Sequence, residues 1–132
     1  MTQPSFPQDR EFTRVPVLMS TTLTSDTNQV SNGHIHDICA RGVLYAGDPA
    51  LPEDTLVKIE IFPQGRTEGF VVRARGRIER CTAFGHGVEF LEIDAESWEH
   101  LQKIIYLHAD DPDRVRHEFE QHHGLRKKRD AG

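Results

Sequence analysis

The sequence predicts a mainly β domain, an antiparallel barrel or sandwich of about six strands, followed by one or two C-terminal helices. Short apolar or alternating segments recur at hairpin spacing between residues 15 and 93, with turn-forming residues between them. No helical apolar period interrupts these strands, which argues against a parallel sheet with crossover helices. After residue 94 the apolar period changes to that of a helix.

The first three strands are expected in the N-terminal third of the chain. Val15–Thr24 is rich in β-branched residues and predicts a strand, which a polar SDTN turn follows. Gln29–Ile38 alternates loosely and predicts a second strand that ends near Cys39. A short third strand is expected after Gly42, before the Pro-containing loop DPALPED.

The fourth strand has the clearest alternation, because Val57, Ile59 and Ile61 occupy every second position of TLVKIEIF. After a PQGRTEG turn, Phe70–Arg80 predicts a long fifth strand. Its inward residues are expected to be Val72, Ala74, Gly76 and Ile78. The sequence FGHG then predicts a turn, and VEFLEI predicts the sixth strand.

The helical part begins at Asp94, a good N-cap for a helix whose apolar stripe is Trp98, Leu101 and Ile105. A second helix is expected from Asp111 as N-cap and Pro112 as its first residue. Its apolar stripe and its C-terminal Gly are expected to be Val115, Phe119 and Gly124. These patterns divide the chain into a flexible leader, a β domain with its first helix, and a second helix with a charged tail, at residues 1–9, 10–108 and 109–132.

The charge and the hydropathy of the chain argue against two classes of protein, those that bind nucleic-acid polymers and those that span membranes. The formal net charge is −5, which argues against binding to a nucleic-acid polymer. No apolar window is long enough to span a membrane, and the polar N-terminus lacks a signal-peptide core, so we expect a cytoplasmic protein with no membrane insertion. In that compartment Cys39 and Cys81 are expected to be free thiols.

The segment HIHDICARG contains two His, one Asp and one Cys, which are residue types that bind metals. In a regular strand His34 and His36 share one face, and Asp37 lies on the other. Ligands divided between two faces cannot converge on one ion without a bulge, and no second ligand pair follows at zinc-site spacing. We therefore interpret the His as surface residues and expect no metal site.

Two polar clusters suit a nucleotide better. Arg10 and Arg14 lie four residues apart just before the first strand. Guanidinium groups bind phosphate bidentately, pair with guanine O6 and N7, and stack on bases. Asp37 and Gly42 lie where the second strand ends, and an exposed carboxylate there can accept from a guanine edge. Taken singly, each cluster is better explained by a charged surface segment or an ordinary turn.

Taken together, the Arg-xxx-Arg and the Asp-x-Cys-x-x-Gly about two strands later resemble the two motifs of the PilZ family. The matching residues are Arg10, Arg14, Asp37, Cys39 and Gly42. The segments TRVPV and HGVEFLEID are also similar to that family, and the resemblance covers roughly residues 10–108. It implies a six-stranded antiparallel PilZ-type β-barrel, usually followed by a helix, and cyclic di-GMP as the ligand.

The resemblance also implies roles for the residues. Arg10 and Arg14 would clamp the phosphates and the guanine Hoogsteen edge, and Asp37 would take a Watson–Crick edge. The residues expected to shape the turn beneath the ligand, or to add a basic group beside it, are Cys39, Gly42 and Arg41. The family usually has Ser where this chain has Cys39, and a thiol is the weaker donor. Affinity falls if that side chain contacts a phosphate, and is unchanged if the position needs only a small residue.

No nucleophile–base or acid–base pair converges on this segment, so we expect a receptor rather than an enzyme, without a cofactor. Without ligand, Arg10 and Arg14 gain nothing from being held in place. Ligand binding would therefore order the N-terminal segment and relay the signal to an unidentified effector protein. The alternative is a PilZ-like interaction adaptor that binds no nucleotide and acts through the C-terminal helices and tail.

Overall fold

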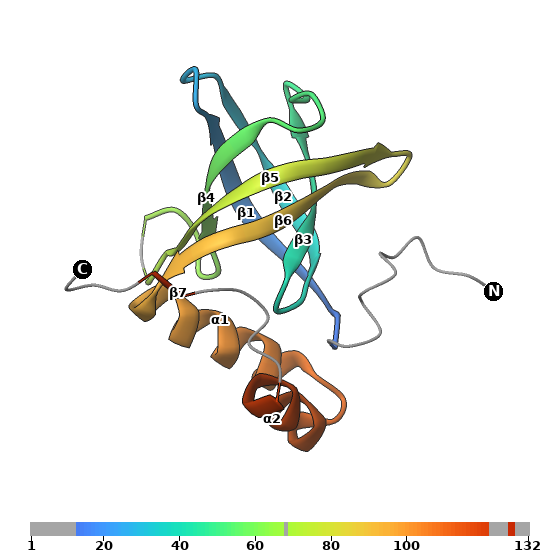
Figure 1. Ribbon diagram of the computed structural model, residues 1–132, viewed down its shortest axis with the longest axis vertical. Helices are drawn as coiled ribbons and strands as arrows, with labels where there is room; N and C mark the ends of the chain where they lie inside the picture. Colours follow the sequence, from blue (N-terminus) through green and yellow to red (C-terminus); the bar gives the residue numbers. More distant parts are fainter. Residues whose placement is uncertain (1–12, 68, 122–126, 129–132) are drawn as a thin grey trace.

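The structure is a computed structural model that describes residues 13–67, 69–121 and 127–128. In this part of the chain six strands form an antiparallel barrel, and two helices follow it (Figure 1). The strands are β1 (Val15–Ser25), β2 (Val30–Ile38), β3 (Gly42–Asp48), β4 (Leu56–Phe62), β5 (Val72–Thr82) and β6 (Gly85–Asp94). The helices are α1 (Ala95–His108) and α2 (Pro112–Gln121). The predicted fold class, a six-stranded barrel followed by helices, is confirmed.

The barrel is closed by a pairing between strands that are distant in the sequence. The strand order is β3-β2-β1-β4-β5-β6, and β3 also pairs with β6, so each of the six strands has two neighbours. All six ladders are antiparallel. Closure satisfies the backbone hydrogen bonds that the edge strands of an open sheet would leave unpaired.

The alternating residues of β4 and β5 point into the barrel, as predicted. Val57, Ile59 and Ile61 are at most 3% exposed. The inward residues expected on β5 are also buried: Val72, Ala74, Gly76 and Ile78. Side chains of alternate residues in a strand face opposite ways, so these residues meet those of the other strands inside the barrel.

The helix α1 begins where the sequence predicts, because Asp94 caps it by accepting a hydrogen bond from the Ser97 backbone N–H at 2.7 Å. Trp98, Leu101 and Ile105 are buried in the same apolar cluster as the barrel residues. Figure 1 shows α1 lying across one end of the barrel. The helix therefore closes that end and extends the core.

The second helix also begins as predicted, since the side chain of Asp111 accepts a hydrogen bond from the Arg114 backbone N–H at 3.2 Å. Val115 is fully buried, and Phe119 is partly buried against the core. The expected C-terminal Gly124 lies outside the described residues. No helix in the described part of the chain is long and apolar enough to cross a membrane.

One local expectation is wrong, and one short strand was not predicted. The FGHG segment was expected to be a turn, but β6 already begins at Gly85, and only the two residues before it form the turn. The ladder continues because Gly85–Gly87 pairs with β5, and His86 and Gly87 also pair with β3. In the expected charged tail, Lys127–Lys128 forms a two-residue strand, β7, parallel to the end of β6.

Candidate functional site

The β2–β3 turn carries most of the residues that the sequence singles out. The backbone N–H of Cys39 donates to the carbonyl of Gly42 at 2.9 Å and closes the turn. The backbone N–H of Arg41 donates to Cys39 Sγ at 3.4 Å, and Cys39 is only 1% exposed. The thiol therefore points inward and supports the turn. This agrees with a position at which a small side chain is required.

Gly42 is required by close approach rather than by an unusual backbone angle. A Cβ atom at this position would lie 2.2 Å from the carbonyl oxygen of Val88 on β6. Two residues further along β6, the Phe90 N–H donates to the carbonyl of Arg41 at 2.8 Å. The turn is therefore held tightly against β6, and any larger side chain at residue 42 would push the two strands apart.

A bulge lies immediately before the turn. The pairing register shifts in β1 between Pro16 and Met19, and in β2 between Ile35 and Asp37. Ile35 and Ile38 are both buried although they are three residues apart, so strict alternation is interrupted. The prediction of the face that Asp37 occupies assumed strict alternation, which the bulge interrupts. Bulges near functional sites often redirect a side chain in this way.

The two His of this segment are exposed side chains on β2. Cys39, by contrast, is buried, so the four candidate ligand residues of HIHDICARG do not all face the same side of the strand. Among the residues that the structure describes, no group of three or more His, Cys, Asp or Glu is placed to hold a metal ion.

The two predicted clusters meet in space. Arg14 Nη1 donates to Asp37 Oδ1, and both side chains are largely buried, at 15% and 20% exposure. Hairpin pairing of β1 with β2 places Pro16 opposite Asp37, which brings the residue before β1 close to the carboxylate. The expectation that Arg14 is unconstrained without ligand is therefore wrong. Arg10 lies outside the described residues.

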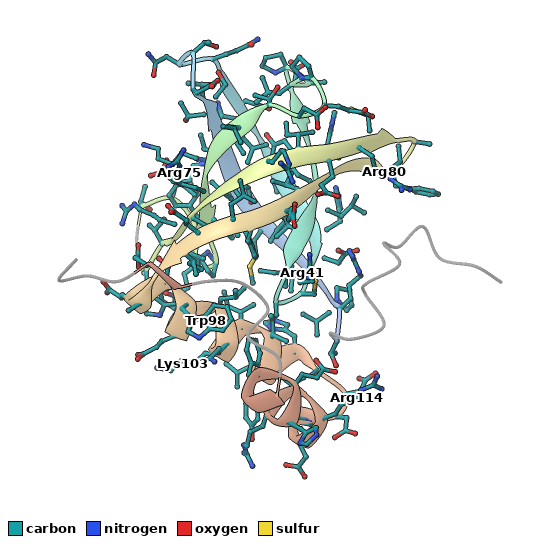
Figure 2. The ribbon with its side chains drawn as sticks, in the orientation of Figure 1. Arg41, Arg75, Arg80, Trp98, Lys103 and Arg114 are labelled. Carbon is teal, nitrogen blue, oxygen red and sulfur yellow. The ribbon has the colours of Figure 1, made fainter. Side chains whose placement is uncertain are left out.

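Arg41 is held by acidic residues on the neighbouring strands. Its Nη2 lies 3.2 Å from Glu89 Oε2, and Arg77 Nη2 lies 3.1 Å from Glu89 Oε1. A hydrogen bond with Glu79 lowers the pKa of Glu89, and the same bond raises the pKa of Glu79. Figure 2 shows Arg41 at the barrel end near the helices. This network fixes the basic side chain that was expected beside the site.

The helix α2 contacts both motif segments, which the sequence did not indicate. Glu118 accepts two hydrogen bonds from Thr13, one from the backbone N–H at 2.6 Å and one from the hydroxyl at 2.8 Å. Phe119 packs against Cys39 and Ala40. The periodicity of α2 identified Phe119 as apolar but carried no signal for Glu118, because its partner lies 105 residues away.

A Cys–His contact lies at the tip of the β5–β6 hairpin. Cys81 Sγ is 3.1 Å from His86 Nδ1, and the two residues are opposite each other in the ladder. Burial and the nearby carboxylate of Glu53 raise the pKa of the Cys81 thiol. A raised pKa disfavours the thiolate, the form in which a cysteine acts as a nucleophile.

A family model described as PilZ domain matches residues 8–107 of the chain. This chain belongs to the PilZ domain family. No curated protein matches the sequence significantly. Solved structures with the same fold include the PilZ domain of YcgR from Escherichia coli with c-di-GMP, at 14% identity and a TM-score of 0.56. That match covers 84% of this chain and 96% of the YcgR chain.

A second similar structure is that of the Bacillus subtilis inhibitor of motility, MotI/DgrA, at 12% identity and a TM-score of 0.59. The match covers 92% of this chain, which spans 56% of the MotI chain. At these identities the likeness of this PilZ chain to both structures shows a shared fold.

In this PilZ domain the residues singled out from the sequence come from two neighbouring segments. The β2–β3 segment supplies Asp37, Cys39, Arg41 and Gly42. The entrance of β1 supplies Arg14, which the ion pair joins to the first of these. The residues that sequence reasoning missed are Thr13, Glu89 and Glu118.

Proposed function

We propose that this PilZ protein is a receptor for cyclic di-GMP and that the nucleotide binds where Arg14 meets Asp37. The ion pair between these two residues carries the proposal, because it joins the Arg-xxx-Arg segment to the β2–β3 turn. The proposed ligand-binding residues are Arg10, Arg14, Asp37, Cys39, Arg41 and Gly42. The solved YcgR PilZ domain contains c-di-GMP, which supports the choice of ligand.

The chemistry of the pair suits a ligand with both phosphate and guanine. A phosphate can replace Asp37 as the anion beside Arg14, and a guanine Watson–Crick edge can replace Arg14 as the donor to Asp37. The exchange leaves neither partly buried group without a partner, which would otherwise be costly. A ligand that carries only one of these groups would satisfy only one half of the pair.

The roles of the remaining residues follow from the turn. Cys39 is buried and supports the turn, so we propose that it acts by shape rather than by contacting a phosphate. Arg41 lies beside the turn, and its guanidinium group is paired with Glu89. It can contribute to binding only if this group contacts the ligand and Glu89 at the same time. Arg10 would complete the clamp from the N-terminal side.

We propose a receptor rather than an enzyme, acting in the cytoplasm of a bacterium, with output through an effector protein. Binding would order the N-terminal segment upstream of Thr13, since Thr13 and Arg14 already have partners without ligand. Such an order–disorder change is a common switching element. The effector would recognise the newly ordered surface.

Isothermal titration of the full chain with cyclic di-GMP tests the proposal and also yields the number of nucleotides bound. The wild-type protein is expected to bind, and Arg14→Ala is expected to remove measurable binding. Arg73→Ala is the matched control, because Arg73 is an exposed β5 residue paired with Glu60, outside both motifs. Absence of heat with the wild-type protein, or full affinity in Arg14→Ala, would overturn the proposed site.

A second candidate function is an interaction adaptor that binds no nucleotide. The observation in its favour is a groove of about 490 Å³ between α1 and α2. Its lining includes Tyr106, Val115, Phe119, Lys103 and Arg116. An adaptor would give no heat with cyclic di-GMP and would lose its partner when the groove is altered, for example by Tyr106→Ala.

A further inference from the structure

Two adjacent residues of α2 contact the two motif segments of the candidate site. Glu118 contacts Thr13, the residue immediately before Arg14. Phe119 contacts Cys39 and Ala40, which follow Asp37 in the β2–β3 turn. One short stretch of α2 therefore contacts both motif segments of the site. One of these segments precedes β1 and the other follows β2.

The carboxylate of Glu118 is used fully in this contact. One oxygen accepts from the Thr13 backbone N–H, and the other accepts from the Thr13 hydroxyl. Arg114 Nε lies 3.2 Å from the second oxygen, and the Glu118 side chain is only 10% exposed. A buried carboxylate is stable only with such partners, so these contacts fix the position of the chain at residue 13.

Phe119 is fixed in turn by the core. Its ring meets that of Trp98 on α1 edge to face, with centroids 5.3 Å apart. Val115, one turn earlier on α2, is fully buried. The position of α2 is thus set by packing against the core of the domain. Through its contacts with Thr13 and the β2–β3 turn, α2 in turn fixes the position of both motif segments.

We propose that α2 is part of the ligand site and that Glu118 and Phe119 are positioning residues for the two motifs. This inference rests on the proposed function. Glu118 holds the backbone next to Arg14 in place before ligand arrives, and Phe119 supports the turn that follows Asp37. A site that is held in place beforehand binds more tightly, because less conformational entropy is lost on binding.

Variants at the two ends of the contact test the proposal in the full chain. Glu118→Ala removes both acceptors, and Glu118→Gln retains one for the Thr13 N–H. Thr13→Val removes only the hydroxyl contact at nearly constant shape, and Thr13→Ser restores it. The control is Asp113→Asn, which removes a 91% exposed carboxylate from the same helix. Binding is measured with cyclic di-GMP, and amide exchange and thermal unfolding are measured without ligand.

Fixing one backbone residue costs about 1–2 kcal/mol, so Glu118→Ala is expected to weaken binding about 5–30-fold. Its Thr13 amide should exchange faster without ligand, while the amides of β4 keep their protection. Glu118→Gln and Thr13→Val should show smaller losses of affinity, and Thr13→Ser and Asp113→Asn should bind like the wild type. If Glu118 only stabilised α2, its replacement would lower the unfolding temperature. The affinity measured at temperatures well below unfolding would then stay unchanged.

Equal or tighter binding by Glu118→Ala would overturn the proposal, and tighter binding would mean that α2 opposes the ligand. Unchanged exchange of the Thr13 amide in that variant would also overturn it, whether or not any nucleotide binds. Absence of binding by the wild-type protein would instead overturn the proposed function, and the two failures are therefore distinguishable.

Discussion

Arg14 and Asp37 form an ion pair across 23 residues of sequence, between the entrance of β1 and the end of β2. The antiparallel register of the β1–β2 hairpin places them together. Each partner is the principal charged residue of one motif, so the pair joins the two motifs in the absence of ligand. Both side chains are partly buried, so removing one residue takes a charged contact away from the other at a place where little solvent can replace it.

A double-mutant cycle on this pair should show strong coupling. Arg14→Ala and Asp37→Ala are each expected to lower the free energy of unfolding by about 1–3 kcal/mol, because a partly buried charge loses an ion-pair contact. The double variant should lose less than the sum of the two. Urea denaturation measures all four proteins, and the barrel should remain folded in each. Additive losses would show that the two charges do not interact in solution.

Replacing the buried thiol should preserve the site. Cys39→Ser is expected to bind cyclic di-GMP at least as tightly as the parent, because a hydroxyl is the stronger hydrogen-bonding group toward the Arg41 N–H. Placing a hydroxyl instead of a thiol at this buried position, against which Phe119 packs, should cost some stability. Calorimetry and thermal unfolding separate the two effects. A clear loss of affinity in a folded variant would assign the thiol a packing or redox role of its own.

A methyl group at residue 42 should disrupt the turn. In Gly42→Ala the new Cβ would meet the Val88 carbonyl oxygen at 2.2 Å, and backbone atoms cannot move aside cheaply. Overpacking of this kind costs about 1–3 kcal/mol or more. We expect a lower unfolding temperature and weaker nucleotide binding together, since β3 must separate from β6. A variant as stable as the parent would show that the two strands lie further apart in solution.

The Glu79–Glu89 pair should give a pH-dependent stability. Because the pKa of Glu79 is raised, Glu79 contributes to the free energy of unfolding below the ordinary Glu pKa, about 4.3. This stabilising contribution is lost as the pH rises through the raised pKa. The lowered pKa of Glu89 means that its contribution is present above that ordinary pKa and is lost as the pH falls through the lowered pKa. The pair therefore stabilises the fold most near the ordinary pKa.

Glu79→Gln tests this directly, because its amide can donate to Glu89 at every pH. The variant should be more stable than the parent at pH 7, and the difference should shrink toward pH 4, as measured by urea denaturation. Glu92→Gln is the control, since the Glu92 carboxylate lies 3.8 Å from Arg75 and is 43% exposed. A Glu79→Gln protein less stable than its parent at pH 7 would contradict the hydrogen bond between Glu79 and Glu89.

Amide exchange should locate the segment that responds to ligand. Exchange in residues 10–14 is expected to slow on adding cyclic di-GMP, while β4 changes little. The Thr13 N–H already donates to Glu118, so the largest change should fall in residues 10–12, which lie outside the described residues. A segment that stays unprotected at saturating nucleotide would exclude the clamp even if the nucleotide binds.

The sequence alone determined the strands, the helix starts and the candidate motifs, because each of these depends on residues close together in the chain. Alternation in β4 and β5 identified the core side chains, and the caps at Asp94 and Asp111 identified the start of each helix. Spacing within the Arg-xxx-Arg and Asp-x-Cys-x-x-Gly segments indicated the family, which the PilZ domain model then matched.

Only the tertiary structure decided how these parts meet. The bulge before Asp37 interrupts the alternation on which its predicted face depended. The need for Gly42 comes from a carbonyl on β6, and the partner of Thr13 is a carboxylate 105 residues away. Periodicity reports which side of its own element a residue occupies. It carries no information about which distant backbone or side chain the folded barrel brings against that residue.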